Sequence, residues 1–393
     1  MARVLQLVPR KHTFSVLYVA SFVLSFHLFF VSYMNSSFLA TFTNETYVGL
    51  VYICASAISM VSLLYVSRVI QKIGNYRLLS ILTLLEFFTF LGLAFAGSAY
   101  LIIPIFILYN VVFPLILYTF DIFFENLTIE ENTTGSVRGT LLTIVNAALV
   151  FAPLTAGFIL HGSNFHALYL ISSFFLVPFY LLMRTYRDFE DPHYHRLRIR
   201  DTVACVNSRK NLRNVFIAQF LLRFFFSWMV IYMPIYLNTV IGFSWTEIGT
   251  LMALILIPYI FLEYPAGHFA DKYFGERKIL VFGFITAALF TGAAAFLGAK
   301  SFLLWVFVLL FSRVGASLIE IMTESYFFKR VNGSDNNTIS FFRITRPVAF
   351  VFGPMIGTVV LSVMNFQYMW LVLGILLLFG VFVSLRLDPV FDT

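Results

Sequence analysis

The chain has 393 residues, of which 60% are hydrophobic and only 11% are charged, and its formal net charge is +7. One soluble core cannot bury so much apolar surface, so the composition excludes a soluble protein and indicates an integral membrane protein. The positive charge does not predict nucleic-acid binding, because the basic residues flank apolar segments, as they do on the cytoplasmic side of membrane proteins.

Long apolar runs predict twelve membrane-spanning helices, because a backbone in lipid must satisfy its own hydrogen bonds. A crossing needs about 20 residues at a rise of about 1.5 Å per residue. The first run is too long for a signal-peptide core, so we expect it to remain as the first span. The predicted spans are residues 13–34, 47–70, 77–97, 100–122, 138–160, 166–186, 214–237, 246–268, 278–298, 302–328, 343–363 and 367–386.

Basic residues gather on one side of these spans. The loops after the odd-numbered spans contain Lys300 as their only basic residue, whereas the other loops are rich in Lys and Arg. Positive charge marks the cytoplasmic side, so we expect a multi-pass protein of the plasma (inner) membrane with both termini in the cytoplasm.

One polar and basic segment, residues 187–213, interrupts the apolar pattern. It predicts an N-terminal six-helix bundle over 1–186, a cytoplasmic linker over 187–213 and a C-terminal six-helix bundle over 214–393. The linker is either a solvated connector or a surface whose arginines contact anionic lipid headgroups.

The two predicted bundles repeat each other with an offset of 201 residues. Gly74 and Gly275 share this offset, as do Pro153 and Pro354. A constant offset in loops and helices indicates parallel repeats. The small residues around both prolines predict helices that bend and approach their neighbours closely.

A charged turn lies between the eighth and ninth spans and has a partial copy between the second and third. The turn consists of Gly267, Asp271, Lys272, Gly275, Arg277 and Lys278, and the copy of Lys72, Gly74 and Arg77, with Gln71 in place of the acid. These residues resemble the cytoplasmic loop motif of major facilitator superfamily transporters. The resemblance implies an all-α fold of two pseudo-symmetric bundles around a central cavity, and secondary active transport by a monomer. In that family the motif stabilises the outward-facing state, with the acid at Asp271 capping the eleventh span.

Polar residues form stripes on spans 1, 4, 7 and 10, which the resemblance places around the cavity. On the tenth span, steps of 4, 3 and 4 residues put all four polar side chains on one helical face. The stripes are Ser21, Ser25, Ser32 and Ser36; Asn110, Pro114, Asp121 and Glu125; Arg223, Ser227, Pro234 and Asn238; and Arg313, Ser317, Glu320 and Glu324. They predict a cavity that contains water.

Ionisable residues deep in a bilayer are costly and are usually functional or paired. We consider Arg313, Ser317, Asn110 and Arg223 as candidate substrate ligands and Glu320 as a candidate proton carrier. The alternative is that Arg313 and Glu320 form ion pairs that only satisfy their charges.

His27 and Glu86 are also candidate proton sites, although a hydrogen-bonded packing role is the favoured interpretation of both.

Charges near the cytoplasmic ends predict an inner gate. We expect three acids, Asp121, Glu125 and Glu324, to pair with arginines when the cavity faces outward and to separate when it faces inward. The candidate arginines are Arg77, Arg138, Arg343 and Arg346.

The sequence therefore predicts transport of a small organic solute, coupled to protons. Efflux of amphipathic compounds is favoured slightly over uptake of sugar-like or nucleoside-like solutes. The alternative is a transporter-like receptor or assembly partner that binds without carrying. No nucleotide-binding loop, metal-binding spacing or nucleophile elbow occurs in the sequence, so we expect neither an enzyme nor a cofactor or metal.

Overall fold

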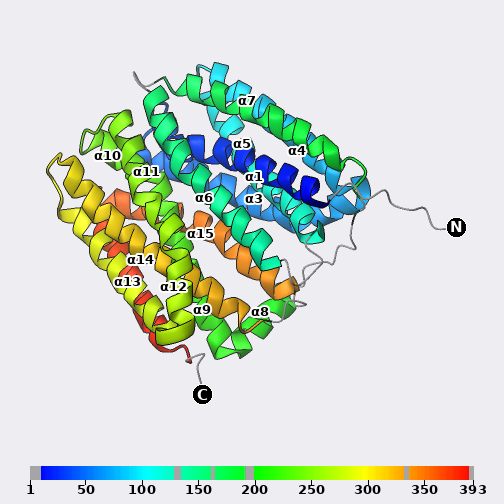
Figure 1. The fold of residues 1–393 in the computed structure, drawn as a ribbon. Helices are drawn as coiled ribbons and strands as arrows, with labels where there is room; N and C mark the ends of the chain where they lie inside the picture. Colours follow the sequence, from blue (N-terminus) through cyan, green and yellow to red (C-terminus); the bar gives the residue numbers. More distant parts are fainter. Residues whose placement is uncertain are drawn as a thin grey trace.

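The computed structural model describes residues 10–127, 134–160, 164–189, 191, 199–331 and 336–388, and their regular structure is entirely helical (Figure 1). Each of the twelve predicted spans corresponds to one helix or to consecutive helices. The N-terminal half contains α1 (Arg10–Ser32), α2 (Asn35–Ala40), α3 (Glu45–Ile73), α4 (Asn75–Phe95), α5 (Ala99–Leu127), α6 (Thr134–Ile159) and α7 (Phe165–Met183), followed by α8 (Ile199–Ser208). The C-terminal half contains α9 (Lys210–Ile231), α10 (Met233–Thr239), α11 (Trp245–Phe261), α12 (Glu263–Phe269), α13 (Gly275–Ala293), α14 (Phe302–Phe328), α15 (Asn336–Val363) and α16 (Tyr368–Leu385).

Ten helical stretches of the described chain are long and apolar enough to cross a membrane, and three of them run through more than one α-helix: Ser15–Ala40, Lys210–Thr239 and Trp245–Phe296. In α6 the shorter apolar stretch Thr143–Ile159 lies beside them. The apolar composition that predicted the spans therefore also determines the helices.

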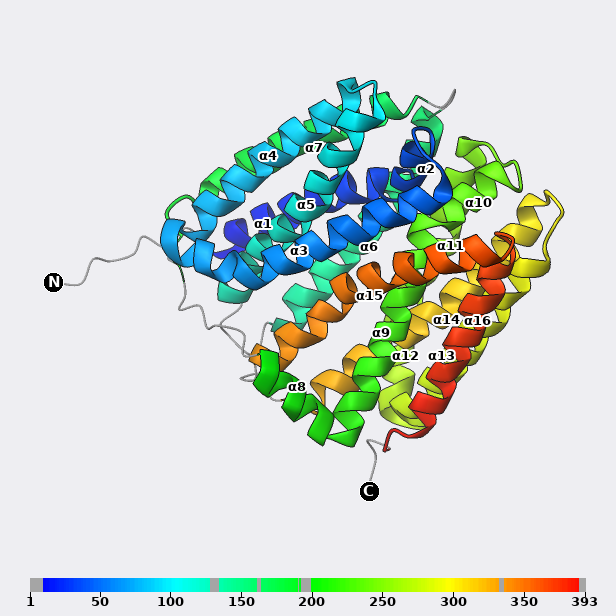
Figure 2. The same cartoon turned by 180° about the vertical axis from the view of Figure 1, so that it is seen from behind.

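Each half packs mainly on itself, two helix pairs make the largest contacts between the halves, and α2 makes smaller ones with α9 and α10 (Figures 1 and 2). In the N-terminal half, α1 packs on α6 and α7, and α4 packs on α5 and α7. In the C-terminal half, α13 packs on α14 and α16, and α9 packs on α15 and α16. The joints between the halves are α6 against α11 and α3 against α15.

The first span of each half is broken, which the sequence analysis did not predict. The break between α1 and α2 falls at Tyr33 and Met34, and the break between α9 and α10 falls at Tyr232. Ser32 bonds back to the carbonyl of Leu28 at 2.6 Å, a contact that bends helices. Pro234 lies in the first turn of α10, where its missing N–H is tolerated.

The paired glycines form the turns that their offset predicted. Gly74 lies between α3 and α4 with φ of 87°, and Gly275 opens α13 with φ of 71°. A side chain is strained at such angles, so both turns need glycine.

The molecule has two different ends. We call the end that carries α8 and the turns at Gly74 and Gly275 the basic side, because Lys72, Lys272 and Lys278 are exposed there. The end that carries α2 and α10 is the opposite side (Figures 1 and 2).

The two halves touch through their backbones at the opposite side. Gly157, near the end of α6, faces Gly249, near the start of α11, so closely that a Cβ on Gly157 would lie 2.8 Å from the Cα of Gly249. The rings of Phe165 and Trp245 are 5.2 Å apart beside them. At the other joint, Gly49 of α3 packs against Thr358 of α15. We call these contacts the closed end; small residues make them possible, as predicted for the fifth span.

Candidate functional site

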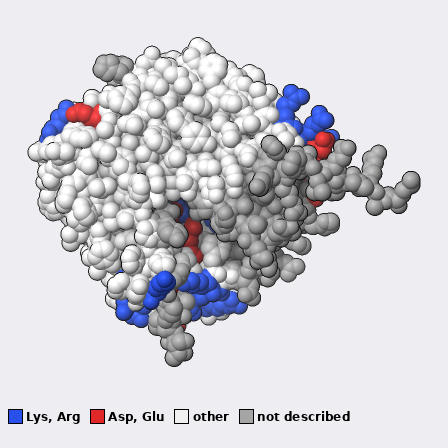
Figure 3. Space-filling model, in the orientation of Figure 1, with Lys and Arg blue, Asp and Glu red and all other residues white. Residues whose placement is uncertain are grey.

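The polar stripe of α14 becomes more exposed toward the basic side. Arg313 is 1% exposed and Ser317 is fully buried, whereas the side chain of Glu320 is 22% exposed and that of Glu324 is 40% exposed. Figure 3 shows a hollow near the middle of the molecule with basic and acidic side chains inside it. We call Arg223, Glu320, Glu324 and Arg346 the charged hollow. It is accessible, while the closed end seals the halves at the opposite side.

Arg223 of α9 lies near both carboxylates of the α14 stripe, Glu320 and Glu324. Its Nη1 lies 2.9 Å from Oε1 of Glu320, and its Nη2 lies 3.8 Å from Oε1 of Glu324. With the Gln219 amide oxygen turned toward it, Arg223 also donates to that oxygen from Nε and Nη2 at 3.1 and 3.0 Å. The same amide then donates to Thr323 at 2.8 Å. Arg223 is thus held in place by one helix turn of α14 and by its own helix.

Arg313 lies deeper in the same stripe and has a different environment. Its guanidinium carbon is 5.1 Å from the ring centre of Phe225 and 5.8 Å from that of Phe226. None of its three nitrogens has a hydrogen-bond partner among the described residues. The ion pair between Arg313 and Glu320 that the sequence left open does not form, because Glu320 pairs with Arg223.

Arg346 of α15 points its exposed side chain into the space between the halves. The charges of Arg223 and Glu320 act on it, as do the hydroxyls of Tyr33 and Tyr109 from the N-terminal half. Two of the predicted gate residues, Arg346 and Glu324, therefore lie beside the candidate ligands.

Two candidate ligands are engaged by their own helices. Ser317 donates to the carbonyl of Val314 at 3.0 Å, and Asn110 donates to the carbonyl of Phe106 at 2.9 Å. Ser317 is also fully buried, so the structure does not offer its hydroxyl to a solute.

His27 of α1 and Glu86 of α4 meet inside the N-terminal half. His27 Nε2 lies 3.7 Å from Glu86 Oε1, and both side chains are fully buried. His27 Nδ1 lies 3.0 Å from the carbonyl oxygen of Ser172, which assigns the donor proton to Nδ1 and the lone pair to Nε2. Neither oxygen of Glu86 has a hydrogen-bond partner among the described residues. The geometry fits a neutral imidazole facing a protonated carboxyl group, as the favoured packing interpretation expects.

A second polar group in the N-terminal half lies next to this pair. Asn35 donates to the hydroxyl of Tyr109 at 3.1 Å and accepts from the hydroxyl of Tyr169 at 2.7 Å. These three residues link α2, α5 and α7 without any charge.

Comparison with known proteins identifies the architecture. Residues 215–392, the C-terminal half, match the family model described as Major Facilitator Superfamily. The whole chain has the fold of a crystallised mutant of the nucleoside transporter NupG, with a TM-score of 0.75, 12% sequence identity, and coverage of 96% of this chain and 100% of that one. The C-terminal half is therefore similar in sequence to the major facilitator superfamily, and the whole chain shares the fold of that solved transporter. No curated protein sequence matches this chain.

One of the predicted gate pairs is formed. Arg343 of α15 lies 3.5 Å from Asp121 of α5, and both side chains are about half exposed. The pair joins the halves in the same structure that has the closed end, whereas we expected it to separate when the cavity opens to the basic side. Glu324 lies near Arg223, which the sequence did not predict as its partner. The side chains of Glu125 and Arg138 lie outside the described part of the chain.

The loop motif occupies the predicted turns. Lys72, Arg77, Lys272 and Lys278 are exposed and Arg277 is half-buried, which suits a surface that contacts lipid headgroups. A Cβ on Gly267 would meet no atom within 4 Å, so close packing is not the reason for this glycine. The side chain of Asp271 lies outside the described part, so its capping role stays a prediction.

Two acids that sequence reasoning missed hold the basic side together. Asp191 accepts from the backbone N–H of Asn75 at 3.0 and 3.2 Å and so caps α4, beside the copy of the motif in which Gln71 replaces the acid. Glu276 is buried and binds Lys329 and Ser325 of the α14 end. Glu276 lies within the motif, but only the packing shows that it points inward; Asp191 is distant in sequence and gave no signal.

Gln219, Tyr33 and Tyr259 were also missed. Gln219 lies one helix turn before Arg223, so the helical spacing of that stripe could have identified it. Tyr33, at the α1–α2 break, and Tyr259, on α11, both lie near Arg313. No sequence pattern indicates this proximity.

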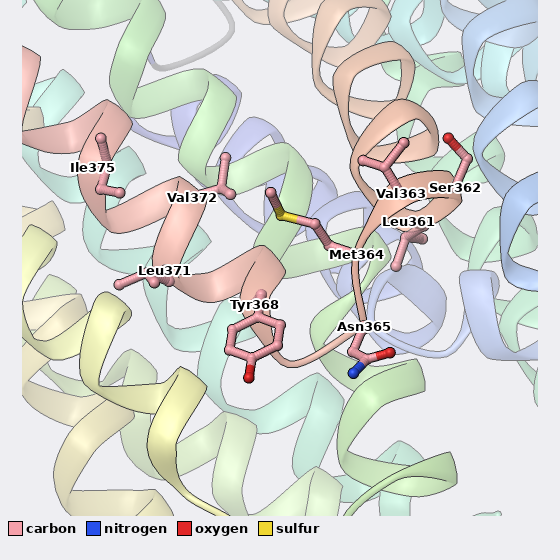
Figure 4. A pocket seen from close by; sticks show the side chains of 9 residues that line it. All are labelled: Leu361, Ser362, Val363, Met364, Asn365, Tyr368, Leu371, Val372 and Ile375. Carbon is pink, nitrogen blue, oxygen red and sulfur yellow. The ribbon is translucent and has the colours of Figure 1, made fainter.

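A recess on the outside of the C-terminal half is not part of this site. It lies where α15 ends and α16 begins, and it is lined by Leu361, Ser362, Val363, Met364, Asn365, Tyr368, Leu371, Val372 and Ile375 (Figure 4). Val363 and Met364 are exposed there, and none of the charged residues of the candidate site lines the recess.

Proposed function

We propose that this protein is a secondary transporter that moves a small organic solute across the membrane by alternating access. One observation carries the proposal: backbone contacts seal the opposite side, while the charged hollow remains accessible. A binding surface that is sealed at one end and open at the other is what one half of an alternating-access cycle requires.

The two joints provide the second half of the cycle. Rocking the halves about the α6–α11 and α3–α15 joints would part the closed end and bring the basic ends together. The Arg343–Asp121 pair would then strengthen as it loses water. Full closure of the basic side, with the hollow sealed from water, would then alternate with the closed end.

Orientation follows from the basic side. We place this side in the cytoplasm, which makes the structure inward-facing and both termini cytoplasmic. We further propose a monomer in the plasma (inner) membrane, with Lys and Arg of the basic side in contact with anionic lipid headgroups.

Proton coupling is the mechanism that the Arg223–Glu320 pair supports. Protonation of Glu320 would remove its charge and free the guanidinium of Arg223, which is then able to bind a polar group of the solute. Return of Glu320 to its ionised form would displace the solute. The ionised carboxylate of Glu320 and the solute thereby compete for the same arginine, and the proton favours solute binding.

Among solutes, we favour amphipathic compounds that are exported over sugar-like or nucleoside-like compounds that are taken up. Aromatic side chains lie around Arg313, with the rings of Phe225 and Phe226 nearest to its guanidinium. Such rings bind apolar solute parts and accept cations over their faces.

The test uses purified protein in liposomes with an imposed pH gradient. The probes are a lipophilic cation, an aromatic carboxylate, a nucleoside and a sugar, each radiolabelled. We expect gradient-driven accumulation of at least one probe, and its loss in Glu320→Gln with exchange at equal pH retained. Asp188→Asn is the matched control, because this carboxylate is 89% exposed at the surface.

Probe binding without flux in any gradient would refute transport and support a receptor. Full accumulation in Glu320→Gln would leave transport intact and remove Glu320 from coupling.

A further inference from the structure

Arg313 is the most anomalous side chain of the molecule. It is 1% exposed at the middle of α14, and Nε, Nη1 and Nη2 all lack hydrogen-bond partners among the described residues. No described carboxylate lies within ion-pair distance of it. A buried charge without partners is strongly unfavourable, so a guanidinium is not kept here for stability alone.

The neighbours of Arg313 offset only part of this cost. Phe225 and Phe226 present their rings to the cation. The hydroxyl of Tyr259 lies near Arg313 and interacts with it, but the two groups do not reach hydrogen-bond geometry. Donors of Arg313 and the hydroxyl of Tyr259 thus lie together with hydrogen-bonding capacity left over, which suits recognition of a polar group.

A second cation, Arg346, also lies near Tyr33. The charges of both Arg313 and Arg346 act on the hydroxyl of Tyr33. The charged hollow and Arg313 together contain three guanidinium groups, of Arg223, Arg313 and Arg346, against the two carboxylates of Glu320 and Glu324. Both carboxylates lie beside Arg223, so the surplus positive charge falls on Arg313 and Arg346.

We propose that Arg313 and Arg346 bind the anionic group of the solute, and that the transported compound is an amphipathic organic anion. The inference rests on the proposed transport function and names its substrate class. A planar guanidinium binds a carboxylate or a phosphate through two parallel hydrogen bonds, and the rings beside Arg313 receive the apolar part.

The position of Tyr33 explains how the subsite is reached. Tyr33 belongs to the N-terminal half, at the break between α1 and α2, and Arg313 belongs to the C-terminal half. A movement that parts the halves at the closed end also withdraws Tyr33 from Arg313. The subsite is therefore covered in this conformation and uncovered in the other.

The experiment measures the melting temperature of the purified full-length protein with probes that differ only in charge. The pairs are 4-phenylbutyrate with 4-phenylbutyramide, and naphthyl phosphate with naphthol. We expect the anions to raise the melting temperature and the neutral partners not to. Arg313→Met should weaken anion binding by about 10- to 100-fold, as expected for lost hydrogen bonds to a charged group.

The same substitution has an opposite effect on the empty protein. Arg313→Met removes an unpaired charge, so it should raise the melting temperature without ligand, whereas removal of a structural arginine lowers it. Arg313→Lys keeps the positive charge but loses the paired hydrogen-bond donors of the planar guanidinium, so it should retain weak anion binding. Arg68→Gln is the matched control, because this exposed arginine also lies over an aromatic ring, that of Tyr65, at 4.8 Å.

Equal shifts from the charged and neutral probes, or an anion shift that survives in Arg313→Met, would overturn the proposal. So would an empty Arg313→Met protein that melts well below the wild type with no anion effect in either. Anion binding that is lost in Arg313→Met, combined with absence of flux in liposomes, would keep the anion site and refute transport.

Discussion

The two halves share a backbone plan but differ in their polar interiors. Inside the N-terminal half, His27 and Glu86 meet in a fully buried pair with no other described charge beside them. In the C-terminal half, Arg223 and Glu320 form a partly exposed pair at the hollow. The first interior is closed to water and the second is open to it.

This difference shows that the repeat preserves turns and joints rather than chemistry. Gly74 and Gly275 keep the same turn, and Tyr33 and Tyr232 mark the same helix break. Among the described residues, the charged group of Arg223, Glu320, Glu324 and Arg346 belongs to the C-terminal half. We infer that the C-terminal half binds, while the N-terminal half closes over it.

The largest effect should come from the contact that joins the halves. Gly157→Leu places a side chain against the Cα of Gly249 and the carbonyl of Trp245, each 2.8 Å from the new Cβ. The closed end cannot then form, so transport should fall to background. Spin labels on α6 and α11 should show the halves apart at the opposite side.

Gly298→Leu is its control, because no atom lies within 4 Å of a Cβ at that glycine. Normal transport by Gly157→Leu would show that the closed end is not part of the cycle.

The next largest effect is a difference in stability loss between substitutions of His27 and of Glu86, the buried pair of the N-terminal half. His27→Ala loses the contacts to Ser172 and the packing on Phe90 at 4.4 Å, and should cost about 2–4 kcal/mol of stability. Glu86→Gln should cost much less, since an amide resembles a protonated carboxyl group in shape. Chemical denaturation in mixed micelles compares the two variants. Equal losses would mean that Glu86 is ionised and paired with His27.

A smaller effect is expected for the ion pair of the C-terminal half. Arg223→Gln leaves Glu320 without its closest partner, and should cost about 1–2 kcal/mol because water still reaches the carboxylate. The double variant with Glu320→Gln should recover most of that loss. A double-mutant cycle on denaturation free energies measures the coupling, and additive losses would argue against a working pair.

The smallest effect belongs to the exposed pair that bridges the halves. Asp121→Asn should change stability by less than about 1 kcal/mol, because the Asp121–Arg343 pair is half exposed and solvated. It should nevertheless shift the distribution of inward- and outward-facing states, measured by labels at the basic side, and the shift should shrink at high salt. A large loss of stability with no shift in state would assign the pair a purely structural role.

Much of the fold could be predicted because lipid restricts the backbone to few choices. Apolar length alone identifies spans such as 302–328, which is α14 residue for residue. The breaks at Tyr33, Tyr232 and Leu262 could not be located, since they depend on single hydrogen bonds and prolines that a hydropathy pattern averages out.

The candidate site was predicted as a set of residues but not as a set of pairs. Helical spacing correctly placed Arg313, Ser317, Glu320 and Glu324 on one face of α14. It could not show that Glu320 turns to Arg223 of α9, that Arg313 is left without a partner, or that Asp191 caps α4 from the far end of the half.

The sequence by itself determined the membrane class, the helical spans, the glycine turns and the repeat, because composition, periodicity and left-handed backbone angles are local properties. Only the tertiary structure decided which charges are neutralised, which end is closed and which arginine is unpaired. Those outcomes depend on distances of a few ångströms between helices that are remote in the chain, and Coulomb interactions and burial change steeply over such distances.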